Sequence, residues 1–262
     1  MGNVNTDRAY NYIRSQILSG KYPPGFDLIG NALALEIGVS RTPIREALLQ
    51  LESDGLVSIR ARLGASVKVM DVREFRELSG LRKALEGYAA GLAAEERSEA
   101  ELQEIRFALE VLREQTEREI AAEQGQLAID EGVREDAQFH IAIINAAKND
   151  HLRREIVRLH LINGLMCARI ALTRKEPATS SDRADFIAFS RNVHAEHQAI
   201  YEAIAQRDAV AAEAAMKRHV QNMIDINFRS ILRAENRMIA RELVSSELTH
   251  RGERKSESDQ SR

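Results

Sequence analysis

Asp136 and His140 lie four residues apart in a segment whose apolar spacing predicts a helix. At that spacing two side chains project about 40° apart on one helical face, close enough to share an ion. The pair alone is a weak indication, because Asp-x-x-x-His also occurs as an ordinary surface or core pairing. His197 follows Glu196 in another predicted helix, where a solvated or hydrogen-bonded imidazole is the default interpretation. The residues alone leave both a metal site and a hydrogen-bonding role open.

Arg41 and Arg45 are also one turn apart, away from the apolar stripe of a helix that begins at Ser40 or Thr42. An α-helix fits the major groove of DNA, and arginines in its first turns can bind guanine or phosphate. The hydroxyls of Ser40 and Thr42 and the N–H groups at the helix N-terminus suit phosphate as well. A solvated helix face is the competing interpretation, and on the pattern alone it is equally good.

Three short helices precede a hairpin in the N-terminal part. The first covers residues 6–19 with Thr6 as its candidate N-cap, the second ends near Gly38, and the third follows after a tight turn. Helix, glycine-containing turn and helix are the sequence form of a helix-turn-helix.

The hairpin that follows predicts a wing. Its two strands, residues 56–59 and 65–69, flank a basic tip that carries Arg60 and Arg62. These two arginines could reach an adjacent groove or the DNA backbone. Residues 1–70 hold eight basic and six acidic residues, whereas the whole chain has a net charge of −3, so any DNA contact must be local.

Every periodic segment from Asp71 to about Arg233 is helical. The expected helices lie near 71–95, 98–125, 130–147, 150–173, 182–206 and 208–233. Four of the starts carry capping residues, namely Asp71, Ser98, Asp182 and Asp208. This pattern predicts a bundle of about six helices.

The predicted fold class is therefore mostly α, in three parts. A winged helix-turn-helix domain with three helices and a two-stranded wing covers 5–70, and an all-helical bundle covers 71–235. The tail 236–262 has almost nothing apolar to bury and is expected to be disordered. A single cysteine, the lack of a leader pattern and the lack of a long apolar stretch favour a cytoplasmic protein.

Several motifs in residues 8–70 resemble the DNA-binding domain of GntR regulators. They include Pro24-Gly25, the run from Gly38 to Leu48, and Gly55-Leu56-Val57. The resemblance implies that Arg41 and Arg45 are the principal DNA contacts, with Thr42 beside them and Gly64 shaping the wing. The family usually has Glu and often Arg where this chain has Gly30 and Asn31, so one common DNA-contacting arginine is expected to be missing.

The C-terminal part resembles the FCD effector domain of the FadR-type branch of that family. The matching motifs are Leu81-Arg82-x-x-Leu85-Glu86, Asp136-x-x-Phe139-His140, His197-x-x-Ile200 and Ala215-Met216-x-x-His219. The resemblance implies a divalent metal bound by Asp136, His140, His197 and His219, with His194 ranked below them. Such donors suit Zn²⁺, Ni²⁺ or Mn²⁺, and the sequence does not choose among them.

A metal with open positions accepts a carboxylate, so small organic acids are the expected effector class. Arg82 could pair with that carboxylate and Asn222 could hydrogen-bond it, although a salt bridge from Arg82 to Glu86 is an equally good interpretation. The predicted function is a metabolite-responsive transcription regulator that binds operator DNA as a homodimer.

Two other functions compete with sensing. In the first, the same regulator holds a purely structural metal and binds its operator regardless of metabolites. In the second, the metal activates water in a hydrolase or lyase. No positioned nucleophile or acid-base motif supports the second, so the sequence predicts that the protein is not an enzyme.

Overall fold

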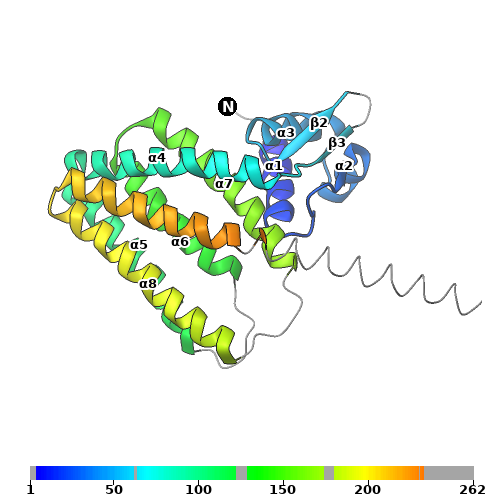
Figure 1. The fold of residues 1–262 in the computed structure, drawn as a ribbon. Helices are drawn as coiled ribbons and strands as arrows, with labels where there is room; N and C mark the ends of the chain where they lie inside the picture. The colour runs from blue at the N-terminus through cyan, green and yellow to red at the C-terminus, as the bar shows by residue number, and fades with distance from the viewer. Residues whose placement is uncertain (1–3, 62–63, 122–128, 174–179, 230, 233–262) are drawn as a thin grey trace, which may run out of the picture.

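The computed structural model describes residues 4–61, 64–121, 129–173, 180–229 and 231–232 (Figure 1). The predicted tail 236–262 and the wing residue Arg62 lie outside these ranges. Within the described part of the chain, no helix is long and apolar enough to cross a membrane.

The N-terminal unit is a winged helix-turn-helix, as predicted. Its elements are α1 (Val4–Leu18), β1 (Asp27–Leu28), α2 (Gly30–Ile37), α3 (Arg41–Ser53), β2 (Val57–Arg60) and β3 (Gly64–Val67). The apolar stripe of α3, which includes Ile44 and Leu51, is buried in a core shared with α1 and α2. Thr6 is not the N-cap that the sequence suggested, because α1 begins before it. It is buried instead, and its hydroxyl donates to Glu46 Oε2 at 2.6 Å.

The wing is part of a three-stranded antiparallel sheet in the order β1-β3-β2. β2 and β3 form the predicted hairpin, with Ser58 opposite Ser66. β1 was not predicted, because two residues are too few to show the alternation that marks a strand. It pairs with β3 through Asp27 and Ser66 and so ties the wing to the loop before α2.

Helices alone make up the described part of the C-terminal unit. They are α4 (Val72–Glu96), α5 (Glu99–Ala121), α6 (Ile129–Ala146), α7 (Asp150–Thr173), α8 (Ser180–Ala205) and a last helix over 209–229, drawn in orange in Figure 1. Asp71 caps α4 by accepting from the Glu74 amide, and Ser98 exchanges capping-box bonds with Glu101 at α5. Of the four helices with a predicted capping residue in this unit, only α8 begins elsewhere, at Ser180 and not at Asp182.

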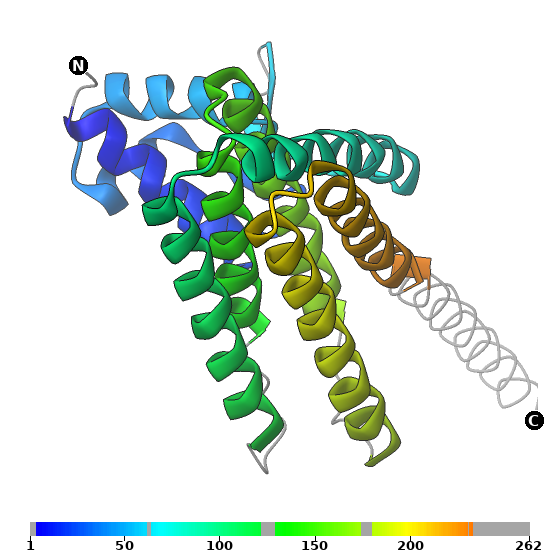
Figure 2. The ribbon, with the colours of Figure 1, turned by 90° about the vertical axis from the view of Figure 1, so that its left-hand side faces the viewer.

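One apolar core joins five of these helices. α5 packs against α6 and α8, and α4 crosses them near one end (Figure 2). The helix over 209–229 also contributes to this core. Each of the five helices provides one of the following buried residues, in chain order: Ala90, Ile105, Phe139, Ile200 and Met216. A rigid interior of this kind holds polar side chains from separate helices in fixed positions.

α7 connects the two units. It packs against α4 and α6 in the helical domain and against α1 in the winged domain (Figure 1). Leu165 of α7 belongs to the core of the winged domain and is 2% exposed. The lack of a side chain at Gly164 gives Leu18 room, because a Cβ there would lie 3.1 Å from Leu18 Cδ2.

Candidate metal centre and DNA-reading surface

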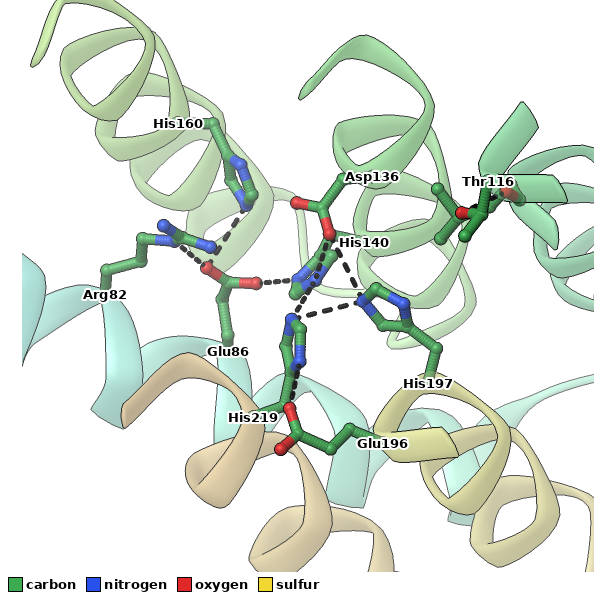
Figure 3. Close-up of polar contacts among 10 residues, drawn as sticks. Arg82, Glu86, Thr116, Asp136, His140, His160, Glu196, His197 and His219 are labelled. Atoms are coloured by element: carbon green, nitrogen blue, oxygen red, sulfur yellow. Dashed lines mark hydrogen bonds and ion pairs between the residues drawn. The ribbon is translucent and has the colours of Figure 1, made fainter. Parts of the chain in front are cut away.

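Three helices bring the four predicted metal ligands together (Figure 3). Asp136 and His140 come from α6, His197 from α8, and His219 from the helix over 209–229. One ligand atom from each residue lies within 4.8 Å of all the others. The three imidazoles are fully buried, and they lie in the apolar core among residues such as Phe139.

The imidazole Nε2 atoms face one another at the centre of the cluster. His219 Nε2 lies 3.2 Å from His140 Nε2 and 3.1 Å from His197 Nε2. Asp136 Oδ1 lies 3.2 Å from His197 Nε2 and 4.0 Å from His140 Nε2. The site therefore gathers three nitrogens and one carboxylate oxygen.

Carboxylates on the outside of the cluster orient two of the rings. His140 Nδ1 is hydrogen-bonded to Glu86 Oε2, and His219 Nδ1 lies 3.0 Å from Glu196 Oε2. An ionised carboxylate can only accept, so each Nδ1 carries a proton, and in a neutral ring the lone pair is then on Nε2. This is the arrangement in which metal-ligating histidines are usually held.

Two inward lone pairs 3.2 Å apart, on His140 and His219, cannot hydrogen-bond each other. A positive charge, either a proton or a metal cation, has to lie between them. Asp136 adds an anionic oxygen on the same side. Three imidazoles and a carboxylate form a donor set that suits Zn²⁺, Ni²⁺ or Mn²⁺, so the residues present fit a divalent metal.

Most of the residues that were predicted to contact DNA lie in α3 or at its start. Arg41, Thr42 and Arg45 are exposed in the first turns of α3, and Ser40 is its N-cap residue with no side-chain cap bond. Their polar atoms are therefore available to an external partner. The core residues of α3 point the other way, as the periodicity predicted.

The wing and the start of α2 carry the other described positions that bear on DNA binding. Arg60 is exposed at the end of β2, and Gly64 begins β3 with a φ of 95°, a backbone conformation that favours glycine. Gly30 and Asn31 form the first turn of α2, where neither residue offers a cation.

Two family models match the chain along most of its length. Residues 5–67 match the bacterial regulatory proteins of the gntR family, and residues 77–222 match the FCD domain. The chain is also 31% identical over 231 residues to the HTH-type transcriptional regulator LutR of Bacillus subtilis, covering 80% of this chain and 95% of LutR. The chain belongs to the GntR family. It is a DNA-binding transcription regulator with an FCD domain, and not an enzyme.

Other similar proteins agree with this assignment. The probable D-xylose utilization operon transcriptional repressor of Paenarthrobacter nicotinovorans is 27% identical over 210 residues, which cover 80% of this chain and 83% of that protein. The structure of E. coli McbR/YncC has a TM-score of 0.70 at 23% identity, covering 88% of this chain and all of the other. At that identity the likeness concerns the fold.

In this GntR regulator, Asp136 and His197 of the proposed centre have pKa values far from their ordinary ones. Burial raises the pKa of Asp136, but the imidazoles of His140, His197 and His219 outweigh that effect and hold it well below its ordinary value. Burial lowers the pKa of His197 to about 4, so its ring is neutral near pH 7, as ligation requires. Nδ1 of His197 is buried without a hydrogen-bond partner among the described residues.

Two polar residues beside the centre were not predicted as parts of it. Glu86 is fully buried, and its carboxylate contacts Arg82, His140 and His160. Burial raises the pKa of Glu86, but Arg82 and the two histidines together lower it well below its ordinary value. The signals for Glu86 in the sequence were its i, i+4 spacing from Arg82 and its place in the Leu81-Arg82-x-x-Leu85-Glu86 motif, and neither placed it beside a metal ligand. Nothing in the sequence pointed to His160.

The predicted effector residues both bind carboxylates of the chain itself. Arg82 Nε donates to Glu86 Oε1 at 2.5 Å, and Asn222 Nδ2 donates to Glu196 Oε1 at 2.5 Å. His194 is not one of the four clustered ligands. It lines a surface cavity of about 280 Å³ between α5 and α8, together with residues that include Arg113 and Tyr201.

Proposed function

We propose that this regulator binds a divalent metal through Asp136, His140, His197 and His219, and that a small carboxylate-bearing metabolite reaches that metal and changes operator affinity. The contact between the Nε2 atoms of His140 and His219 carries the proposal, because two facing lone pairs need a positive charge between them and a divalent metal supplies one. The burial of three imidazoles supports it further, since unpaired buried polar groups are costly.

A metal bound by four protein ligands can still accept another donor. Ni²⁺ and Mn²⁺ favour higher coordination numbers, and Zn²⁺ can expand to five. A carboxylate is a suitable additional ligand. Asn222 is linked to His219 through Glu196, and Arg82 is linked to His140 through Glu86, so both side chains lie close to the proposed ligands.

Operator binding follows from the exposed face of α3. We propose that Arg41 and Arg45 read base edges or phosphates in the major groove, with Ser40, Thr42, Arg60 and Arg62 on the backbone and Gly64 shaping the wing. A single helix-turn-helix has a small interface, so the regulator is expected to act as a homodimer on a pseudo-palindromic site in the cytoplasm.

The test uses the full-length protein and an operator selected from random DNA. Metal analysis after purification without chelators should give close to one divalent ion per chain. Sugar acids, hydroxy acids and dicarboxylates are then screened by thermal shift in the metal-loaded protein, and every acid that binds is tested for its effect on operator affinity.

Three outcomes separate the competing functions. An acid that stabilises the loaded protein but not the stripped one, and that shifts operator affinity, supports metal-dependent sensing. Operator affinity that no acid changes would assign the metal a structural role. Absence of metal from the wild type, before and after incubation with Zn²⁺, Ni²⁺ or Mn²⁺, would refute the metal site itself.

A further inference from the structure

Glu86 sits between the metal centre and a helix that enters the winged domain. Its Oε2 is hydrogen-bonded to His140 Nδ1, while its Oε1 lies 3.1 Å from His160 Nε2 and 2.5 Å from Arg82 Nε (Figure 3). The side chain is 0% exposed, so bulk solvent does not reach it and these partners compensate its charge. A single rigid carboxylate therefore joins a proposed metal ligand to His160.

His160 belongs to α7 and is not one of the four proposed ligands. Its ring centroid is 5.4 Å from that of His140. Its Nε2 is buried and has no hydrogen-bond partner among the described residues, which leaves the 3.1 Å contact with Glu86 Oε1 as its polar interaction there. Any movement of Glu86 therefore changes the environment of α7 directly.

The next turn of α7 lies against the DNA-binding domain. Ile162 is 3% exposed, and a Cβ added at Gly55 would lie 3.1 Å from its Cδ1. Leu165 lies in the winged core, and Gly164 leaves room for Leu18 of α1. These contacts are close-packed, so a shift or rotation of α7 cannot be absorbed by empty space.

We propose that Glu86 is a positioning residue with two roles: it orients His140 for the metal, and through His160 it couples metal occupancy to α7 and the winged domain. This inference rests on the proposed metal site. A metal that fixes His140 also fixes the hydrogen bond to Glu86, and hence the second oxygen that faces His160. Coupling then requires only that α7 prefers one position when the metal is bound and another when it is absent.

A second metal bound by Glu86, His140 and His160 is the competing interpretation, since their ligand atoms also lie within 4.8 Å of one another. The Arg82 guanidinium argues against it, because it already compensates the carboxylate at 2.5 Å and would repel a cation. One metal per chain is therefore expected.

The experiment uses full-length protein stripped of metal, with Zn²⁺ as the probe. Zinc affinity is measured by chelator competition, and hydrogen exchange of the backbone amides is compared with and without Zn²⁺. In the wild type, zinc should slow exchange in α6 and α8, and also in α7, α1 and the segment around Gly55. His160→Gln should keep zinc affinity within about threefold and lose the zinc effect in α1 and around Gly55. His151→Gln, at an exposed position in α7, is the matched control and should behave as wild type.

Glu86→Gln tests the positioning role. It should weaken zinc binding by about 10- to 100-fold, as loss of an orienting carboxylate commonly does, and should shift the visible absorption of the Co²⁺-loaded protein. Unchanged zinc affinity with an unchanged Co²⁺ spectrum would overturn this role. Misfolding of this variant leaves the His160→Gln comparison to decide.

The outcomes distinguish failure of the inference from failure of the metal site. A wild type that binds no zinc refutes both. A wild type that binds one zinc but shows protection only in the ligand-bearing helices keeps the metal site and overturns the coupling. Retained protection of α1 in His160→Gln, or a second zinc lost in that variant, also overturns it.

Discussion

Arg82 and Glu86, one turn apart on α4, form an ion pair with an Nε–Oε1 distance of 2.5 Å, and their side chains are 5% and 0% exposed. The same helix carries a second pair at the same spacing, Arg73 and Glu77, at 2.9 Å but 87% and 62% exposed. Chemistry and spacing are therefore equal, and burial is the main difference.

That difference predicts effects of very different size when the arginine is lost. Arg82→Ala should lower the free energy of unfolding by about 3 kcal/mol or more, because it leaves a buried carboxylate with less compensation. Arg73→Ala should leave it nearly unchanged, since exposed pairs contribute little. Urea unfolding of both variants in metal-free buffer measures the contrast. Equal stability of the two would show that the Arg82 pair is not buried in solution.

The turn of the helix-turn-helix depends on Gly38, which ends α2 with a φ of 73°. A Cβ there would meet nothing closer than Arg8 Nη2 at 3.9 Å, so the cost of Gly38→Ala is conformational and not steric. We expect a loss of about 1–2 kcal/mol in unfolding free energy. Gly30→Ala, in the first turn of the same helix, has space and no positive φ, and should be neutral or slightly stabilising. Thermal unfolding of the winged domain compares them.

The sequence predicted the helices and the caps at Asp71, Ser98 and Asp208, because those signals are local, whereas the proposed caps at Thr6 and Asp182 were wrong. The stripe of Ile44, Ala47, Leu48 and Leu51 predicted the buried face of α3, and Ser98 with Glu101 predicted the start of α5. Strand β1 could not be seen in this way, because its two residues owe their conformation to pairing with β3.

In the candidate site, too, local signals could be read from the sequence and tertiary contacts could not. Asp136 and His140 share a helical face, so spacing alone brought them together, whereas His197 and His219 could be added only through the family resemblance. Neither route assigned the residues around the ligands to the site. Glu86 belonged to a matching motif but looked like half of an ordinary i, i+4 pair, and His160 had no motif. Their roles depend on how α4 and α7 cross α6, which is a property of tertiary packing.

Operator recognition should depend on the exposed arginines of α3. Arg41→Ala and Arg45→Ala should each weaken specific binding by about 1–3 kcal/mol and leave the melting temperature unchanged, because both side chains are solvent-facing. Gln50→Ala, exposed at the other end of the same helix, is the control and should bind as wild type. Fluorescence anisotropy with the selected operator gives these affinities. Wild-type affinity in both arginine variants would remove α3 as the recognition helix.

Self-association is expected to involve the outer face of α4. Leu81 and Tyr88 lie seven residues, or about two turns, apart on it and are 44% and 51% exposed, so they present apolar surface on one side of the helix. Leu81→Glu with Tyr88→Glu should shift a dimer toward monomer in sedimentation experiments at micromolar concentration. Phe107→Glu, at an exposed position on α5, provides the comparison and should not. A dimer that survives the double substitution must use another face.

Removal of His219 provides the sharpest test of the ligand set, because its Nε2 lies within 3.2 Å of the Nε2 atoms of both His140 and His197. His219→Ala takes away the donor shared by both contacts and also leaves a cavity, so a lower melting temperature alone would be ambiguous. The dependence on metal is not ambiguous. In the wild type, a free metal concentration a thousand times the Kd should add about 4 kcal/mol to the free energy of unfolding, and chelation should remove it.

His219→Ala should bind little metal and should unfold at the same temperature with metal or with chelator. Asp136→Ala, His140→Ala and His197→Ala should behave in the same way, because each removes one of the four donors. His151→Ala, which changes an exposed imidazole outside the cluster, should keep both the metal and the chelator-sensitive stabilisation. Calorimetry and metal analysis of the same preparations decide the matter, since full occupancy in the His219 variant would mean that His219 is not a required ligand or that the cation is held elsewhere.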